Sequence, residues 1–271
     1  MSKLYFLGDS TESQMLGLVI VSEGKTAVID GGTLGDAEQL CELLQKVSSG
    51  RVDAWFFTHP HHDHIGAFSR IFELGESITV EDVYHKFPTI EELKECGARY
   101  SGEIELWEKV DDIFKQRLAG RVHSLEVGEE FQLGKVKITV LRVYNENIRA
   151  NFINNSSAVL RIDGERASVL ILGDLGKEGG DEVMKKCTLE SLTTDYTQMA
   201  HHGQGGVRRE FYEYIKPKRC IWPSPLWLWD NDAGEGFDTG PWLTVRTREW
   251  VSALGVTEHI VEKDGLQIIE I

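Results

Sequence analysis

Residues 58–66 read THPHHDHIG and hold four of the nine histidines of this 271-residue chain. The apolar stretch VDAWFFT runs directly into them and predicts a strand. In α/β folds, functional sites gather where strands end. Four histidines within six positions, with an aspartate among them, do not fit a run of surface side chains, and we interpret the segment as a metal site. The side chains with the spacing H-x-H-x-D-H are His59, His61, Asp63 and His64.

The residue types of this segment indicate which ions it binds. Imidazole and carboxylate groups together suit zinc and similar divalent ions. In an extended turn, His59 and His61 point to the same side and hold one ion, while Asp63 and His64 face a neighbouring ion. His62 is left over, and we interpret it as a non-ligand.

Two later segments supply further metal-ligating side chains after strand-like stretches. Asp174 follows the apolar run SVLIL, and a carboxylate at this place can bridge two ions. His201 and His202 follow another strand-like stretch in QMAHHGQGG. Taken alone, Asp174 fits a turn and the histidine pair fits a loop. Their order along the chain favours the metal interpretation.

The composition limits the function classes. Hydrophobic residues make up 41% of the chain and charged residues 27%, a balance typical of globular proteins. The formal net charge of −15 repels phosphate backbones. It therefore disfavours long nucleic acid as a partner and leaves a small-molecule or phosphoester substrate.

The N-terminal sequence and the cysteines favour a cytoplasmic location. MSKLYFLGDSTES has no long apolar run behind a basic start, so we expect no secretory signal. No stretch approaches the roughly 20 apolar residues that span a bilayer. The cysteines form no CxxC pair, which predicts reduced and mostly buried thiols. These are Cys41, Cys96, Cys187 and Cys220.

The first half of the chain reads as strands followed by alternating strands and helices. Three short strands end at the turn-rich GGTLGD, and residues 37–47 have helical spacing of apolar side chains with Asp36 as N-cap. A further helix follows the histidine segment. Residues 88–120 are rich in charge, and their pattern predicts one broken helix or two helices. This segment is a cap over the site, an oligomer contact or a solvated pair of surface helices.

The second half repeats this organisation. Strands come first, with hairpin-like turns at Leu133–Gly134 and Asp163–Gly164, and alternating helices and strands follow. The chain closes with a helix around TREWVSAL and a hairpin-like HIVEKDGLQIIEI. Two halves that each open with strands and close with helices predict helices outside two sheets packed face to face.

On these residues, the sequence resembles the metallo-β-lactamase superfamily, specifically the hydrolase branch that includes the domain attached to bacterial competence DNA-uptake proteins. The resemblance implies an α/β fold, the four-layer αβ/βα sandwich, as a single domain over 1–271 with a helical insertion at about 88–120. It also implies a dinuclear metal site along one edge of the sheets. The matching pieces are VIDGG at 28–32, THPHHDHIGAF at 58–68, NNSSAVLRIDG at 154–164, LILGD at 170–174 and AHHGQGG at 200–206.

One departure from the commonest superfamily pattern concerns the first ion. A third histidine usually completes that site, and the only histidine well placed in order is His123, which has no supporting motif. In the resembling branch an asparagine before S-x-V-L takes this place, here Asn154 or Asn155, and we favour Asn154. An amide oxygen is a harder ligand than imidazole, so manganese becomes an alternative to zinc. Both asparagines also fit a simple turn.

The resemblance thus implies two divalent ions, zinc in the first instance. The first ion takes His59, His61 and Asn154, and Asp174 bridges to the second. The second ion takes Asp63, His64 and one of the two adjacent histidines, and the sequence leaves open whether this is His201 or His202.

The implied reaction is hydrolysis by a water that the two ions activate as hydroxide. Asp63 and Asp174 orient it, and the histidine of the pair that is not a ligand protonates the leaving group. We expect Asp63, Asp174 and His202 to be catalytic. The substrate is a phosphoester or carboxylic ester, with a phosphodiester favoured.

Other functions and contacts stay open at this point. A lactone, thioester or amide hydrolase, a non-catalytic metal-binding sensor and a di-iron oxidoreductase are the alternatives. Residues 88–120 leave room for a homodimer. Residues 221–242 carry four of the seven tryptophans and form either a pocket wall or a packed loop. Residues 83–88 bring Tyr84, His85 or Lys86 near the metals, unless His85 is a satisfied loop histidine.

Overall fold

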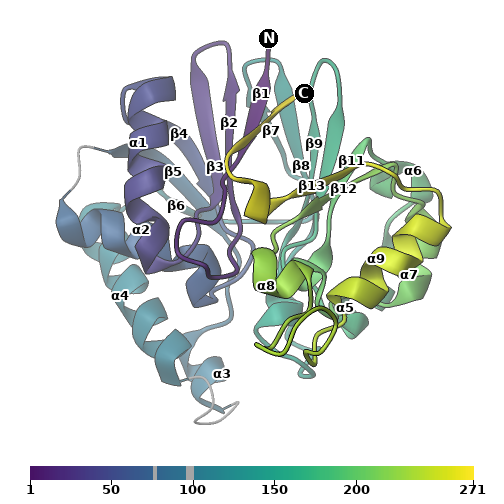
Figure 1. Ribbon diagram of the computed structural model, residues 1–271. Helices are drawn as coiled ribbons and strands as arrows, with labels where there is room; N and C mark the ends of the chain where they lie inside the picture. The colour runs from purple at the N-terminus through teal and green to yellow at the C-terminus, as the bar shows by residue number, and fades with distance from the viewer. Residues whose placement is uncertain (76–77, 96–100) are drawn as a thin grey trace.

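A computed structural model gives the structure of this protein and describes residues 1–75, 78–95 and 101–271. Within these residues the chain forms two sheets of seven strands each (Figure 1). The first sheet has the order β14-β1-β2-β3-β4-β5-β6, and its strands are β1 Lys3–Phe6, β2 Gly17–Ser22, β3 Lys25–Asp30, β4 Arg51–Phe56, β5 Thr79–His85, β6 Val122–Ser124 and β14 Gln267–Glu270.

The second sheet has the order β13-β12-β11-β10-β9-β8-β7. Both predicted turns in its first half connect antiparallel neighbours, because β7 pairs with β8 and β9 pairs with β10. Its strands are β7 Glu130–Leu133, β8 Val136–Arg142, β9 Val159–Asp163, β10 Ser168–Ile171, β11 Tyr196–Gln198, β12 Arg219–Trp222 and β13 His259–Val261.

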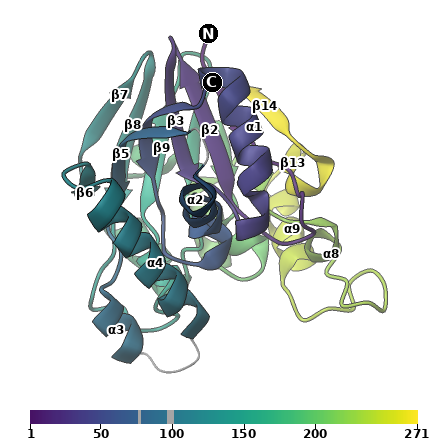
Figure 2. The same cartoon turned by 90° about the vertical axis from the view of Figure 1, so that its left-hand side faces the viewer.

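Helices cover the outer face of each sheet. The first sheet carries α1 Ala37–Ser48, α2 His62–Leu74, α3 Ile90–Glu95 and α4 Ser101–Arg117, as Figure 2 shows from the side of these helices. The second half contributes α5 Lys177–Lys186, α6 Leu189–Leu192, α7 Arg209–Ile215, α8 Leu226–Trp229 and α9 Thr244–Ala253. The layers run helix, sheet, sheet, helix (Figure 1), so the predicted four-layer αβ/βα sandwich is confirmed.

Three clusters of buried apolar side chains hold the layers together. One lies between the sheets, and the other two lie between each sheet and its helices. The strand β4 shows why the sequence VDAWFFT is apolar on both faces. Phe56 packs into the core between the sheets, whereas Trp55 and Phe57 pack under the helices. A strand buried on both faces needs an almost continuous apolar run.

Asp36 precedes α1 as expected, but its side chain does not cap that helix. Its carboxylate turns back and accepts hydrogen bonds from the backbone N–H and the hydroxyl of Thr33, at 2.9 and 2.7 Å. Asp36 is therefore the N-cap residue of α1, as predicted, but its side chain makes no capping hydrogen bond to that helix. The carboxylate instead stabilises the short 3-10 turn Leu34–Asp36 that leads into α1.

The end of the chain also differs from the prediction. The strands β13 and β14 do not form a hairpin, since β13 pairs parallel with β12 and β14 pairs antiparallel with β1. They belong to different sheets, and the 3-10 turn Glu262–Asp264 crosses between them (Figure 2). Each strand completes a sheet edge, which a hairpin of two strands would not do.

The helical prediction for 88–120 holds for the described part of that segment. Trp107, Val110 and Phe114 of α4 are buried in the same cluster as Phe68 of α2.

Of the cysteines, Cys41 and Cys220 are buried and Cys187 is partly buried, and Cys96 lies outside the described residues. Among residues 1–75, 78–95 and 101–271, no helix has both the length and the apolar character needed to cross a membrane.

The buried carboxyl of Glu262 makes the stability depend on pH. Its side chain is fully buried, and burial raises the pKa well above the ordinary value of 4.5, although His202 lowers it in part. The folded protein thus holds a proton that the unfolded chain releases, so stability falls as pH rises above about 4.5. We expect Glu262→Gln to gain stability relative to the wild type between pH 5 and 8.

Urea unfolding of chelator-treated protein at several pH values measures this difference. Glu235→Gln, at an exposed position, is the matched control and should follow the wild-type curve. A constant offset between Glu262→Gln and the wild type across this range would contradict the prediction.

Candidate metal centre

The predicted ligands come together where strands of both sheets end. His59 follows β4, Asp174 follows β10, and the 3-10 turn Ala200–Gly203 follows β11. The strands β10 and β11 are parallel neighbours, and the backbone N–H of His201 donates to the carbonyl of Gly173. The N–H of Ala158 donates to the carbonyl of Thr58, which joins the two sheets at this place.

Two groups of side chains present metal-ligating atoms within 4.8 Å of one another. One group is Asp63, His64, Asp174 and His202, and the other is His59, His61 and Asp174. Asp174 belongs to both groups. Its carboxylate oxygens lie 3.3 Å from the Nε2 atoms of His64 and His202, and 3.7 Å from that of His59. This is the shared position that the sequence predicted for a bridging carboxylate.

The donor set fits divalent cations. Three buried atoms of the first group, Nε2 of His64, Nε2 of His202 and Oδ1 of Asp174, have no hydrogen-bond partner among residues 1–75, 78–95 and 101–271. Buried polar atoms are costly when they are left unpaired. Imidazole nitrogens and carboxylate oxygens that converge on one point match the ligand preferences of zinc and related ions.

The two adjacent histidines share a backbone conformation but differ in burial and in the contacts of their rings. Both His201 and His202 have positive φ, at 52° and 53°, a conformation that is uncommon outside glycine. His202 is fully buried, and its Nδ1 donates to the carbonyl of Pro223 at 2.7 Å, which directs Nε2 to the centre. The hydroxyl of Ser224 donates to the carbonyl of His202 and helps to hold this turn.

His201 has a different environment. It is outside both ligand groups, and its side chain is 23% exposed. Its Nε2 lies 3.9 Å from an oxygen of Asp174 and 3.3 Å from the amide nitrogen of Asn154. The geometry therefore favours His202 as the ligand and leaves His201 at the edge of the centre.

The side chains of the two candidate asparagines also have different contacts. Asn155 uses its side chain elsewhere, since its Oδ1 accepts from the backbone N–H groups of Gly176 and Gly179 near the start of α5. Asn154 lies beside His201, and its Oδ1 is buried without a hydrogen-bond partner. His123 lies on β6 at the surface and bonds to Asp82. Of the two asparagines, Asn154 is therefore the one whose side chain lies beside His201, at the edge of the centre.

Aromatic contacts engage two of the other segments that the sequence singled out. Trp222 is buried in the core of the second sheet, while Trp227 and Trp242 contact each other with ring centroids 4.7 Å apart. His85 stacks on Phe114, and burial lowers the pKa of His85 to about 4. His62 is 63% exposed.

Comparison with known proteins now decides the family. The family model of the metallo-β-lactamase superfamily matches residues 16–139. ComE operon protein 3 from Bacillus subtilis (strain 168) is 38% identical over 216 residues, which are 73% of this chain and 25% of that protein. The chain belongs to the metallo-β-lactamase superfamily. It spans about a quarter of the length of this relative.

Solved structures with the metallo-β-lactamase fold also resemble the structure of this chain. The metallo-β-lactamase fold protein YhfI from Bacillus subtilis superposes with a TM-score of 0.57 at 12% identity, covering 100% of both chains. CmlA, a di-iron β-hydroxylase from Streptomyces venezuelae, gives a TM-score of 0.55 at 13% identity, covering 100% of this chain and 54% of that one. At these identities the likeness concerns the fold.

Asp30, in the segment VIDGG, belongs to the centre although its place in the sequence gives no sign of this. It ends β3, is fully buried, and its Oδ2 accepts a 2.7 Å hydrogen bond from Nδ1 of His64. The backbone N–H and hydroxyl of Thr58 also donate to it, at 2.8 and 2.7 Å. A carboxylate in this position fixes the ring of His64 so that Nε2 faces the centre.

The electrostatics of this superfamily site favour a cation. Burial lowers the pKa of His64, but Asp174 and other carboxylates more than offset it and raise the pKa to about 10. Burial lowers the pKa of His61 to about 4. His61 is therefore neutral and ready to bind at neutral pH, whereas an ion that binds His64 displaces a proton.

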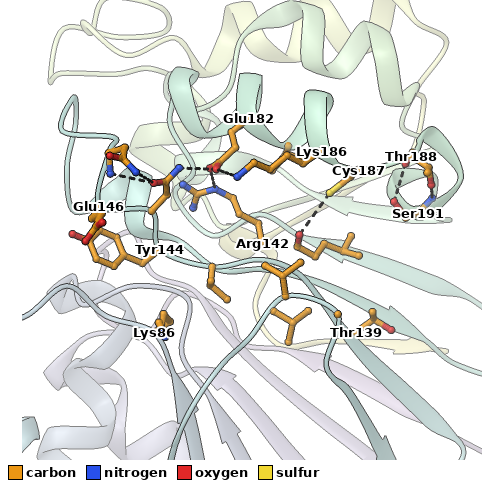
Figure 3. Close-up of a pocket in the computed structure, with 18 residues that line it drawn as sticks. Lys86, Thr139, Arg142, Tyr144, Glu146, Glu182, Lys186, Cys187, Thr188 and Ser191 are labelled. Carbon is orange, nitrogen blue, oxygen red and sulfur yellow. Dashed lines mark hydrogen bonds and ion pairs between the residues drawn. The ribbon is translucent and has the colours of Figure 1, made fainter.

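A cavity of about 750 Å³ lies between β8 and α5, outside the metal centre (Figure 3). At its wall, the guanidinium of Arg142 pairs with Glu182 at 2.9 Å. The same guanidinium donates to the carbonyl of Asn155, within the 3-10 turn Asn154–Ser156, and to that of Ser157, directly after the turn. The wall of this cavity thus supports one side of the metal centre.

We expect Asp30→Ala to weaken zinc binding about 10–100-fold, the usual effect of removing a hydrogen-bond partner of a metal ligand. Without the carboxylate, His64 loses the contact that fixes its ring. Chelator competition measures the affinity. Asp82→Ala is the matched control, because Asp82 holds His123 at the same 2.7 Å distance but at the surface. Equal affinities of Asp30→Ala and the control would contradict the expectation.

Proposed function

We propose that this chain is a hydrolase that uses two divalent metal ions and acts on a phosphodiester. The observation that carries the proposal is the position of Asp174, which is shared between two convergent ligand groups. The unpartnered buried atoms of His64 and His202 support it. Membership of the metallo-β-lactamase superfamily places this donor set in a fold known for such chemistry.

The proposal assigns a role to each side chain. His59, His61 and Asn154 hold the first ion, Asp174 bridges, and zinc is the favoured metal, with manganese the alternative because Asn154 offers an amide oxygen. The second ion is held by Asp63, His64 and His202.

Two ions in this site would polarise the substrate oxygen and lower the pKa of a water between them. Asp174 and Asp63 orient the attacking group by their fixed carboxylates. His201 is partly exposed and free of the ligand groups, so it is the side chain positioned to pass a proton to the leaving group.

The substrate class rests on two arguments. The resemblance of the sequence motifs to the hydrolase domain of bacterial competence DNA-uptake proteins supports a phosphodiester. The net charge of −15 favours a small phosphodiester over long nucleic acid. We also propose a cytoplasmic location, which the buried Cys41 and Cys220 support.

Metal content and a substrate panel test the proposal. The protein is analysed for zinc, manganese and iron, then loaded with zinc or manganese and assayed on bis-nitrophenyl phosphate, a nitrophenyl ester and a lactone. Two ions with phosphodiester turnover support the proposal. Turnover of only the ester or lactone would replace the substrate class. A redox-active iron pair would indicate an oxidoreductase, and failure to bind metal would overturn the metal centre.

Separate alanine variants test the two adjacent histidines. His202→Ala should lose the second ion together with activity, because His202 belongs to the buried ligand group. His201→Ala should keep both ions and lose turnover. Loss of metal in both variants would remove His201 from the proton-transfer role.

A further inference from the structure

Two glutamine side chains connect to the metal centre and are not part of the ligand groups. Gln14 lies in the loop between β1 and β2, and Gln204 directly follows the 3-10 turn that carries His201 and His202. The amide nitrogen of Gln204 donates to the side-chain oxygen of Gln14 at 2.7 Å. The amide nitrogen of Gln14 donates to Oδ2 of Asp63 at 3.0 Å. Both glutamines are half-buried.

The contact with Gln14 restricts the carboxylate of Asp63. The same oxygen lies 3.2 Å from Nε2 of His202, so its orientation decides how the carboxylate faces the other members of its ligand group. A carboxylate on a single bond can turn unless a neighbour holds it. The backbone N–H of Leu16, two residues after Gln14, also donates to the carbonyl of Asp63. One loop therefore fixes both the backbone and the side chain of this residue.

Gln204 decides which end of the Gln14 amide faces Asp63. An amide can turn by half a rotation and present either its N–H₂ or its oxygen. Because the oxygen of Gln14 accepts from Gln204, its nitrogen must face the carboxylate. Without Gln204, the amide of Gln14 is free to present its oxygen to Asp63, which repels a carboxylate.

The loop that carries Gln14 is itself anchored. The indole N–H of Trp227 in α8 donates to the carbonyl of Glu12 at 2.8 Å. The carboxylate of Asp9 accepts from the backbone N–H of Thr11 at 3.0 Å. These bonds limit the movement of the loop, so the position of the Gln14 amide is defined from both sides.

We infer that Gln14 and Gln204 are positioning residues that hold Asp63 in its metal-binding orientation, with Gln204 acting through Gln14. The inference rests on the proposed function, because it takes Asp63 as a ligand of the second ion. It adds to the centre one residue from the loop between β1 and β2, which carries none of the proposed ligands, and one residue that directly follows the turn of His202. The apolar side chain of leucine, similar in size to glutamine, removes the hydrogen bonds and little else.

Zinc binding by Gln14→Leu and Gln204→Leu tests the inference. Chelator competition should show about 10–100-fold weaker binding of one ion in Gln14→Leu and a smaller loss in Gln204→Leu, with the other ion unchanged. The double variant should equal Gln14→Leu, because Gln204 acts through that residue. Gln116→Leu, at an exposed position on α4, is the matched control and should bind both ions as the wild type does.

The outcomes separate the inference from the proposed function. If the wild type binds two ions and both leucine variants bind them equally well, the glutamines are not positioning residues and the proposed function stands. If both ions weaken together with a lower melting temperature of the metal-free protein, the glutamines act on the fold, and the inference is also overturned. A wild type that binds fewer than two ions would overturn the proposed function, and the inference with it.

Discussion

Replacing Asp174 with alanine is expected to remove at least one of the two ions and to lower hydrolysis about 10³-fold or more. Asp174 is 99% buried and is the residue common to both ligand groups. Its loss leaves each group one ligand short and leaves His64 and His202 without the carboxylate between them. Metal-bound charge stabilisation is worth several kcal/mol, and each 1.36 kcal/mol in the barrier is a factor of ten in rate.

Elemental analysis and turnover of the zinc-loaded variant measure this effect together. Asp112→Ala, an exposed carboxylate on α4, should keep both ions and full activity. Asp174→Asn preserves the shape of the side chain and tests the charge. We expect it to retain the fold and to lose most of the activity. A variant without Asp174 that keeps two ions and wild-type turnover would show that the ligand groups do not share this residue.

The sequence predicts the centre well where its ligands are close in the chain. The H-x-H-x-D-H segment sets four side chains within one strand end and one helix start, so their spacing alone indicates a site. The choice between His201 and His202 depends instead on contacts from Pro223 and Ser224, which lie about twenty positions away. A pattern of neighbouring residues contains no information about such contacts.

Residues that support the ligands are the hardest to predict from sequence. Asp30 ends a strand before two glycines and looks like a turn residue, and Gln14 and Gln204 stand 190 positions apart. The same limit explains the error at the C-terminus. The apolar alternation of β13 and β14 predicts two strands correctly, but alternation does not state which sheet edge each strand completes. Which strands pair and which side chains meet across long stretches of sequence becomes visible only in the folded chain.

The ion pair between the buried Arg142 and the partly buried Glu182 should have the largest effect on stability outside the centre. Arg142 is 4% exposed, and its guanidinium also donates to the carbonyls of Asn155 and Ser157 (Figure 3 shows the pair). Breaking a buried pair costs about 3–5 kcal/mol. Glu182 keeps its contacts with Asn145 and Lys186, so we expect Arg142→Met to lose about 3 kcal/mol, near the lower end of that range.

Denaturant unfolding of Arg142→Met, Glu182→Leu and the double variant measures this cost. The double variant should recover part of the loss, because it leaves no unpaired buried charge. Arg209→Met provides the control, since Arg209 and Glu213 form an exposed pair at 2.8 Å whose loss costs about 1 kcal/mol or less. A loss in Arg142→Met no larger than this control would mean that the pair contributes little. The turn of Asn154 would then be held by its own backbone bonds.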